Sequence, residues 1–159
     1  MLQAAAHKQR SLCPVSAALD IFGDKWSLLI IRDAMVRGYR TFREFQAAGE
    51  GIATNILTDR LYRLQTADLL TTETDARDGR LTLYRLTPKG IALAPVLLEL
   101  LIWGARHEHT AVPPSVLLHM EQNRAALLAE AYRRWEQRDP TPLIPPFTSP
   151  AAPAKGYHP

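Results

Sequence analysis

The segment from residue 51 to residue 65, GIATNILTDRLYRLQ, carries two kinds of side chain on two sides of a predicted helix. At about 100° per residue, three leucines share one side: Leu57, Leu61 and Leu64. The other side carries compact hydrogen-bonding groups, with Thr54 and Arg63 at its margins: Asn55, Thr58, Asp59 and Tyr62. Amide and hydroxyl groups near a helix N-terminus can bond base edges and phosphates. For this helix alone, a merely solvated polar face is the alternative explanation.

Arginines on both sides of this segment favour an anionic partner. Arg40 and Arg43 precede it, and Arg77 and Arg80 flank a predicted turn at residues 75–79. Arginine binds phosphate well through its planar set of donors, so we expect Arg40, Arg43 and Arg63 to contact a nucleic-acid backbone. Three acids stand among these residues and argue against simple non-specific adhesion: Asp59, Asp75 and Asp78. They would repel phosphates unless arginine neutralises them or they accept from cytosine amino groups.

The elements around this segment follow a recognisable order. Pro14 suits the start of a first helix, an apolar helix follows from residue 25, and Thr41 with Glu44 predicts a capping box on a short third helix. Two glycines then mark a turn, which makes the segment at 51–65 the second helix of a helix-turn-helix. The runs LLTTET at 69–74 and RLTLYRLT at 80–87 are β-compatible and predict a hairpin. A hairpin directly after a helix-turn-helix is a winged-helix arrangement.

Two further helices are predicted after the hairpin. Thr87 and Pro88 are typical of a helix start, and the run to Trp103 is strongly apolar. Pro113 and Pro114 begin a last helix, whose stripe extends to about Trp135. From residue 139 the chain reads DPTPLIPPFTSPAAPAKGYHP, a proline-rich composition that predicts a tail without a packed core.

Composition limits the classes of protein. The chain has 159 residues, a net charge of +3 and 47% hydrophobic residues, which suits one domain with extensions and is mildly basic. No apolar run of membrane-spanning length and no signal peptide are recognisable, and a single cysteine fits a reducing compartment, so we expect a cytoplasmic protein without membrane contact. No P-loop, dinucleotide-binding glycine pattern, HExxH or nucleophile elbow is present, so we expect no enzyme, no cofactor and no metal site.

The order of the motifs resembles the HxlR family of bacterial transcriptional regulators, relatives of the MarR winged-helix proteins. The resemblance covers about residues 13–106 and is carried by these motifs: CP at 13–14, GDKW at 23–26, RTFREF at 40–45, GIATNILTDRLYRL at 51–64, YRLTPKG at 84–90 and WG at 103–104. It implies a homodimer on a palindromic operator, usually as a repressor. It also implies that the first and the post-wing helices form the dimer interface, which would involve Val15, Leu19, Leu97, Leu100, Leu101 and Trp103.

The chain departs from the family pattern at two positions. Ala53 stands where the family often has a serine before its recognition helix, so Thr54 would have to cap that helix. Asp68 replaces the usual glycine ahead of the first wing strand, and aspartate tolerates a left-handed backbone better than most residues.

Two kinds of regulatory site are conceivable. Some family members sense oxidants through a cysteine in the matching CP motif, and Cys13 stands at a predicted helix N-terminus, where a thiol pKa can be lowered. Packing as a small apolar residue at the interface is the favoured alternative. Trp26, Trp103 and Trp135 could line a ligand pocket, but anchoring a core or an interface is the more common role of such residues.

The sequence predicts a division of the chain into four segments and one function. We expect a flexible arm at 1–12, a winged-helix DNA-binding and dimerisation domain at 13–108, a helical extension at 109–138 and a proline-rich tail at 139–159. The predicted fold class is mostly α with a small β-hairpin wing. We expect a sequence-specific, homodimeric repressor that binds double-stranded DNA and responds to a small molecule or a redox signal. A winged helix used as a protein-interaction module without specific DNA binding is the alternative.

Overall fold

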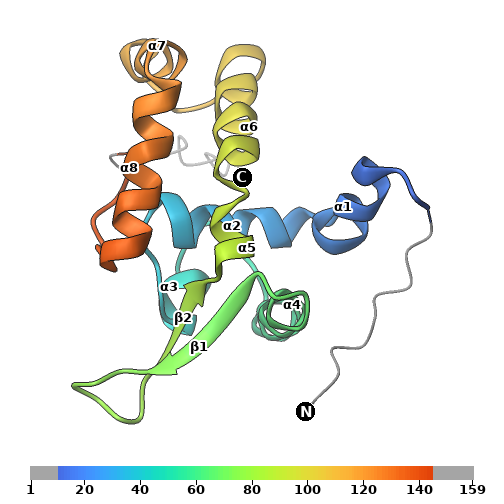
Figure 1. The fold of residues 1–159 in the computed structure, drawn as a ribbon, viewed down its shortest axis with the longest axis vertical. Coiled ribbons are helices and arrows are strands. Elements are labelled where there is room, and N and C mark those ends of the chain that lie inside the picture. Colours follow the sequence, from blue (N-terminus) through green and yellow to red (C-terminus); the bar gives the residue numbers. More distant parts are fainter. Residues whose placement is uncertain (1–10, 145–159) are drawn as a thin grey trace, which may run out of the picture.

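A computed structural model describes residues 11–144 as a mostly helical chain with one two-stranded antiparallel sheet, so the predicted fold class is confirmed (Figure 1). The elements in chain order are α1 Pro14–Phe22, α2 Lys25–Val36, α3 Phe42–Gln46, α4 Thr54–Thr66, β1 Leu70–Thr74, β2 Thr82–Leu86, α5 Pro88–Ile91, α6 Ala94–His107, α7 Pro114–Gln122 and α8 Arg124–Gln137. Figure 1 shows α6, α7 and α8 at one end of the molecule, and α3, α4 and the hairpin at the other.

Side-chain caps define the starts of three helices. The Asp24 carboxylate accepts from the backbone N–H groups of Trp26 and Ser27 and begins α2. Thr41 and Glu44 form the predicted capping box of α3. The Thr87 hydroxyl accepts from the Gly90 N–H and begins α5, as the sequence predicts. These caps satisfy backbone donors that have no partner inside the helix.

Two predicted single helices are each divided in the structure. The run after Thr87 becomes α5 and α6 because Pro95 has no N–H to donate back to the preceding turn. The last helix becomes α7 and α8, which meet at Asn123, a residue outside helical backbone geometry with φ −122° and ψ 29°. The segment Pro88–His107 is long and apolar enough to cross a membrane, but within it α6 packs on α2, α7 and α8.

The hairpin has the predicted strands. Leu70 pairs with Leu86, and Thr74 pairs with Thr82. Asp68, with φ 60°, takes the left-handed conformation expected where the family has glycine. Leu69, Leu70 and Leu86 are buried under the hairpin and fix which face of the sheet meets the helices.

The core has two parts. Leu57, Leu61 and Leu64 of α4 are 0–2% exposed and pack with Phe45 and Ile31 in the first part. The second part lies among α6, α7 and α8: Val36, Leu98, Ile102, Met120, Leu127 and Ile144. The buried leucine ridge of α4 therefore forces the opposite side of that helix outwards.

Residues 139–144 differ from the predicted tail. The Leu143 N–H donates to the Val36 carbonyl, and Ile144 is 7% exposed. Gly38, with φ +73°, allows this approach because a Cβ there would collide with the Pro140 carbonyl. The prediction of a tail without packing is thus wrong for Leu143 and Ile144, whose apolar side chains pack in the second part of the core. Residues 1–10 of the predicted arm and 145–159 of the tail lie outside the described residues.

Candidate nucleic-acid interface

The polar side of α4 is on the surface. We call it the recognition face and define it as Thr54, Asn55, Thr58, Asp59 and Tyr62, all of which are exposed. The Tyr62 ring is 68% exposed although it is a large aromatic residue. The Asn55 amide makes no hydrogen bond with any residue of the described range 11–144. An exposed amide, hydroxyls and phenol on a helix whose back is buried can meet the edges of another molecule.

The N-terminus of α4 has no side-chain cap. Ala53 cannot supply one, and the Thr54 hydroxyl accepts from the Gln46 side chain at 2.6 Å. The expectation that Thr54 caps this helix is therefore wrong, because Thr54 is already the first helical residue. The Thr58 hydroxyl donates back to the Thr54 carbonyl at 2.9 Å. Uncapped N–H groups at an exposed helix N-terminus suit a phosphate oxygen.

Asp59 is neutralised by arginines on both sides. Its carboxylate lies 3.0 Å from Arg63 Nε and 3.1 Å from Arg60 Nη1. Arg60 also reaches Asp24 at 3.2 Å and so connects the start of α2 to α4. Although burial opposes it, hydrogen bonds from Ser27 and Trp26, together with the charge of Arg60, lower the pKa of Asp24. Pairing with arginine neutralises Asp59, so that this acid need not repel DNA phosphates.

The acids of the hairpin tip shape the turn. Asp75 Oδ1 accepts from the backbone N–H groups of Arg77 and Asp78, and these bonds lower the pKa of Asp75. Asp78 accepts from the Arg80 N–H at 3.1 Å. The guanidinium groups of Arg77 and Arg80 are exposed and make no bond to any described residue. The tip therefore presents two free cations, while its acids are occupied by backbone donors.

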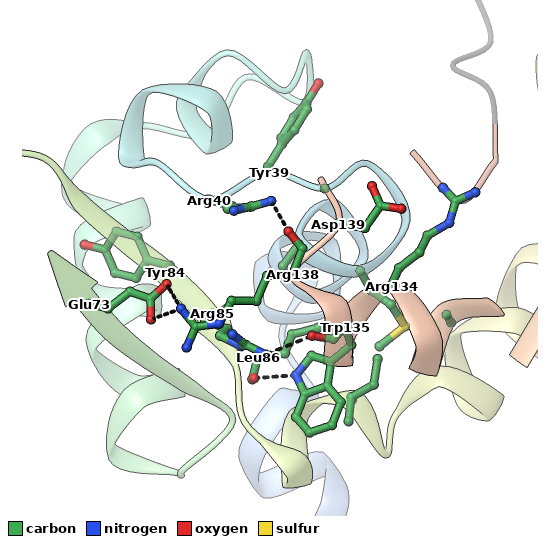
Figure 2. Close-up of a pocket in the computed structure, with 15 residues that line it drawn as sticks. Tyr39, Arg40, Glu73, Tyr84, Arg85, Leu86, Arg134, Trp135, Arg138 and Asp139 are labelled. Atoms are coloured by element: carbon green, nitrogen blue, oxygen red, sulfur yellow. Dashed lines mark hydrogen bonds and ion pairs between the residues drawn. The ribbon is translucent and has the colours of Figure 1, made fainter. Parts of the chain in front are cut away.

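Arg40 and Arg43 have different surroundings although both precede α4. Arg43 is exposed, and its side chain has no partner among residues 11–144. Arg40 Nη2 donates to the backbone carbonyl of Arg138, at the end of α8, at 2.8 Å (Figure 2). The sequence predicts that both residues contact the DNA backbone in the same way. In the structure only Arg43 is free, because the extension after residue 109 folds back onto Arg40.

The residues predicted for a dimer interface differ in their exposure: some lie on the surface and others are covered by the chain itself. Val15, Leu19, Leu100 and Trp103 are 47–66% exposed, which is unusual for large apolar side chains. Val96, which belongs to the same predicted apolar run, is 43% exposed on the same helix as Leu100. Leu101 is half-buried, and Leu97 is 4% exposed inside the chain's own core. The assignment of Leu97 to a dimer interface is therefore wrong, because its side chain is already covered.

Two polar residues near the recognition face were missed by sequence reasoning. Gln46 lies at the end of α3 and bonds Thr54, and Arg60 connects Asp24 to Asp59. Helical spacing places Arg60 near the buried edge of α4, and this position was the only feature of the sequence that could have indicated its role. Within residues 11–144, His, Cys, Asp and Glu form no cluster of three or more that could hold a metal ion.

Comparison with known proteins agrees with this geometry. The model of the HxlR-like helix-turn-helix family matches residues 21–111, which includes α2 to α6 and the hairpin. The chain belongs to this family. The family consists of transcriptional regulators and not of enzymes, so the chain is a helix-turn-helix regulator of transcription.

Individual relatives of this HxlR-like chain cover about three fifths of it. The uncharacterized HTH-type transcriptional regulator YdeP of Bacillus subtilis is 30% identical over 96 residues, which are 60% of this chain and 74% of YdeP. Among solved structures, PA1607 has a TM-score of 0.59 and 40% identity over 64% of this chain and 70% of its own. The redox regulator HypR in its oxidized form has a TM-score of 0.55 and 28% identity over 62% of this chain and all of its own length, 100%.

Proposed function

We propose that this protein represses transcription by binding a specific double-stranded DNA sequence as a homodimer. The observation that carries the proposal is the recognition face, which stands opposite a fully buried leucine ridge on the second helix of a helix-turn-helix. Asn55, Thr58 and Tyr62 would meet base edges in the major groove, and the uncapped N-terminus of α4 would meet a phosphate. The Asp59 carboxylate, although paired with Arg60 and Arg63, would still accept a hydrogen bond from a cytosine amino group.

The exposed arginines would bind the DNA backbone. Arg43 before α4, Arg63 at its margin and Arg77 and Arg80 on the wing surround the recognition face in sequence and carry exposed guanidinium groups. The wing would follow the backbone beside the groove or enter the minor groove. Arg40 would contribute chiefly by holding the end of α8 against the segment between α2 and α3.

A second copy of the chain would cover the exposed apolar side chains of α1 and α6. Val15, Leu19, Leu100 and Trp103 form the candidate surface, with Val96 beside them on α6. Two-fold symmetry would then require an inverted repeat in the operator, with half-sites about one helical turn of roughly ten base pairs apart, or a multiple of that. A protein that binds the DNA of a bacterial cell would work in the cytoplasm.

Selection of bound sequences from random duplexes tests the function directly. We expect an inverted repeat to be enriched, and we expect affinity to fall steeply with salt, by a log–log slope of about 0.9 for each phosphate neutralised. Arg80→Ala should flatten that slope on every duplex, whereas Gln122→Ala on the distant helix α7 should not. A chain that enriches no sequence, and whose weak binding does not depend on salt, would favour the protein-interaction module.

A redox signal is the second branch of the proposal. Cys13 is exposed and stands at the cap position of α1, so it has the accessibility that a reactive thiol needs. As the chain has one cysteine, oxidation would join two chains or attach a small thiol. Cys13→Ser should abolish any loss of DNA binding caused by a mild oxidant and leave binding of the reduced protein unchanged. A response that persists in this variant would remove the thiol from the mechanism.

A further inference from the structure

A buried carboxylate lies in α2, the helix that contacts α1, α4, β2, α6 and α8. Asp33 is 3% exposed, and its Oδ1 atom is shared by two arginines. Arg32 donates to it through Nη2 at 2.8 Å and through Nε at 3.0 Å, and Arg37 Nη1 lies 3.1 Å from it. We call these three residues the α2 triad. A buried charge needs such partners, because it has lost the water that would otherwise hydrate it.

Both arginines of the α2 triad also bond the turn that joins α3 to α4. Arg32 Nη1 donates to the Glu50 carboxylate at 3.0 Å, and Arg37 Nη1 donates to the Ala48 carbonyl at 2.9 Å. Ala48 and Glu50 stand two residues apart, between the end of α3 and the start of α4. The triad therefore holds the turn of the helix-turn-helix at two points.

Few other contacts hold this turn. Within the described range 11–144, the backbone N–H and carbonyl groups of residues 49–52 make no hydrogen bond to other backbone groups. Gly49 and Gly51 have φ angles of +90° and +72°, and a Cβ at either position would meet nothing within 4 Å. Of residues 49–52 only Ile52 is buried. Because glycine adopts many backbone conformations, the turn needs partners elsewhere to keep one of them, and the α2 triad supplies such partners.

Stability alone gives a poor reason for a buried charge at Asp33. Burial raises the pKa of Asp33, and this effect outweighs the opposing charges of Arg32 and Arg37 and the hydrogen bonds from Arg32. Removing a charged group from water costs about as much free energy as the attraction to its partners returns, so neutral side chains are often equally stable in such places. What a carboxylate supplies here, and a neutral side chain does not, is one fixed meeting point for two cations.

We propose that Asp33 is a positioning residue for DNA recognition, which acts through Arg32 and Arg37 to fix the turn before α4. This inference rests on the DNA binding proposed above. The first turn of α4 has no side-chain cap, so the segment that leads into it determines where the side chains of Thr54 and Asn55 stand. Hydrogen bonds to base edges depend closely on that placement, whereas the exposed arginines of α3 and the wing reach phosphates without it. Sequence-specific binding should therefore depend on Asp33, and non-specific binding should not.

NMR relaxation of backbone amides in the full chain without DNA tests whether Asp33 fixes the turn. In the wild type, order parameters at residues 48–54 should be those of a rigid backbone, about 0.85. Asp33→Asn keeps an oxygen but removes the charge, so the two guanidinium groups should repel each other and release the turn, and these order parameters should fall below about 0.6. Glu130→Gln changes a carboxylate of α8 that also pairs with two arginines, and it should leave the turn unaffected.

Competition between the selected operator and a random duplex tests the consequence for recognition. We expect Asp33→Asn to lower the affinity for the operator by about tenfold, as the loss of one base contact would, and to change the affinity for the random duplex by less than about twofold. Glu130→Gln should leave the ratio of the two affinities unchanged.

A second variant covers the case in which Asp33→Asn does not fold. Glu50→Gln changes a side chain that is 38% exposed and removes one of the two links to the turn. It should lower the order parameters and the affinity ratio in the same direction as Asp33→Asn, by a smaller amount.

The two measurements can fail separately. Unchanged order parameters at residues 48–54, or a fall spread evenly over the chain, would overturn the role of Asp33 in the turn. A released turn with an undiminished preference for the operator, or an equal loss on both duplexes, would overturn its role in recognition. A wild-type chain that prefers no sequence would refute the proposed function and with it the role in recognition, whereas the relaxation result, obtained without DNA, would still decide whether the α2 triad holds the turn.

Discussion

Two groups of arginines in this protein have opposite surroundings. Arg43, Arg77 and Arg80 are exposed around the helix-turn-helix and the wing tip, and their side chains bond none of residues 11–144. Arg40, Arg85 and Arg138 meet between the hairpin and α8, where each donates to a backbone carbonyl or a carboxylate. The same residue type thus serves two purposes. Arginines without a partner among residues 11–144 are available to phosphates, whereas the bonded ones fasten α8 to the hairpin and to the segment before α3.

The contact region between α8 and the hairpin should account for the largest effect on folding. Trp135→Ala removes a half-buried indole and its bond to the Leu86 carbonyl, so we expect the free energy of unfolding to fall by about 2 to 3 kcal/mol. Denaturant unfolding followed by circular dichroism measures this. Tyr132→Ala, on the exposed side of the same helix, should cost less than half as much. Equal losses would mean that α8 is not fastened at Trp135.

Substitutions in the recognition face should have the second-largest effect, and they should change DNA sequence specificity rather than the stability of the fold. Asn55→Ala removes an exposed amide without a partner in the described chain, so the unfolding free energy should change by less than about 0.5 kcal/mol. Discrimination against a wrong base pair at one operator position should fall by about 1 to 3 kcal/mol. Competition binding with single-base operator variants measures it. An equal loss on operator and random duplexes would contradict the assigned role of Asn55.

Arg40 and Arg43 allow the most direct comparison of a bonded arginine with a free one, since they lie only three residues apart. Arg43→Ala should weaken binding to every duplex and leave the unfolding free energy within about 0.5 kcal/mol. Arg40→Ala should lower the unfolding free energy by about 1 kcal/mol because it removes the bond to the Arg138 carbonyl. Salt titrations and denaturant curves of both variants are needed. If Arg40→Ala affects only DNA binding, and as strongly as Arg43→Ala, the two groups are not distinct.

A smaller effect should appear in acid. Hydrogen bonds from Arg133 and Arg134 lower the pKa of Glu130 from 4.5 to about 2. A folded-state pKa below the unfolded one means that this carboxylate stabilises α8 above about pH 4.5 and loses its effect as the pH falls towards 2. The difference in thermal midpoint between wild type and Glu130→Gln should therefore be present at pH 6 and shrink towards pH 2. A constant difference across that range would exclude the ion pairs as its cause.

Much of the fold and part of the site could be predicted because the responsible signals are local. The capping box at Thr41 and the exposed face of α4 depend on residues within a few helical turns of each other, and the two strands are neighbours along the chain. The division at Pro95 was also within reach, because proline cannot donate to the preceding turn. The assignment of Leu97 could not be checked in the same way, since periodicity marks an apolar side chain without showing whether the chain itself or a partner covers it.

The sequence by itself determined which side chains stand opposite the leucine ridge, because helical periodicity and the burial of leucine depend only on spacing and side-chain type. Only the tertiary structure decided which arginines remain free. The carbonyl that binds Arg40 lies 98 residues further along the chain, at the end of a helix beyond the family match. No local pattern can reveal such a contact, since it exists only after two separate parts of the core have packed together.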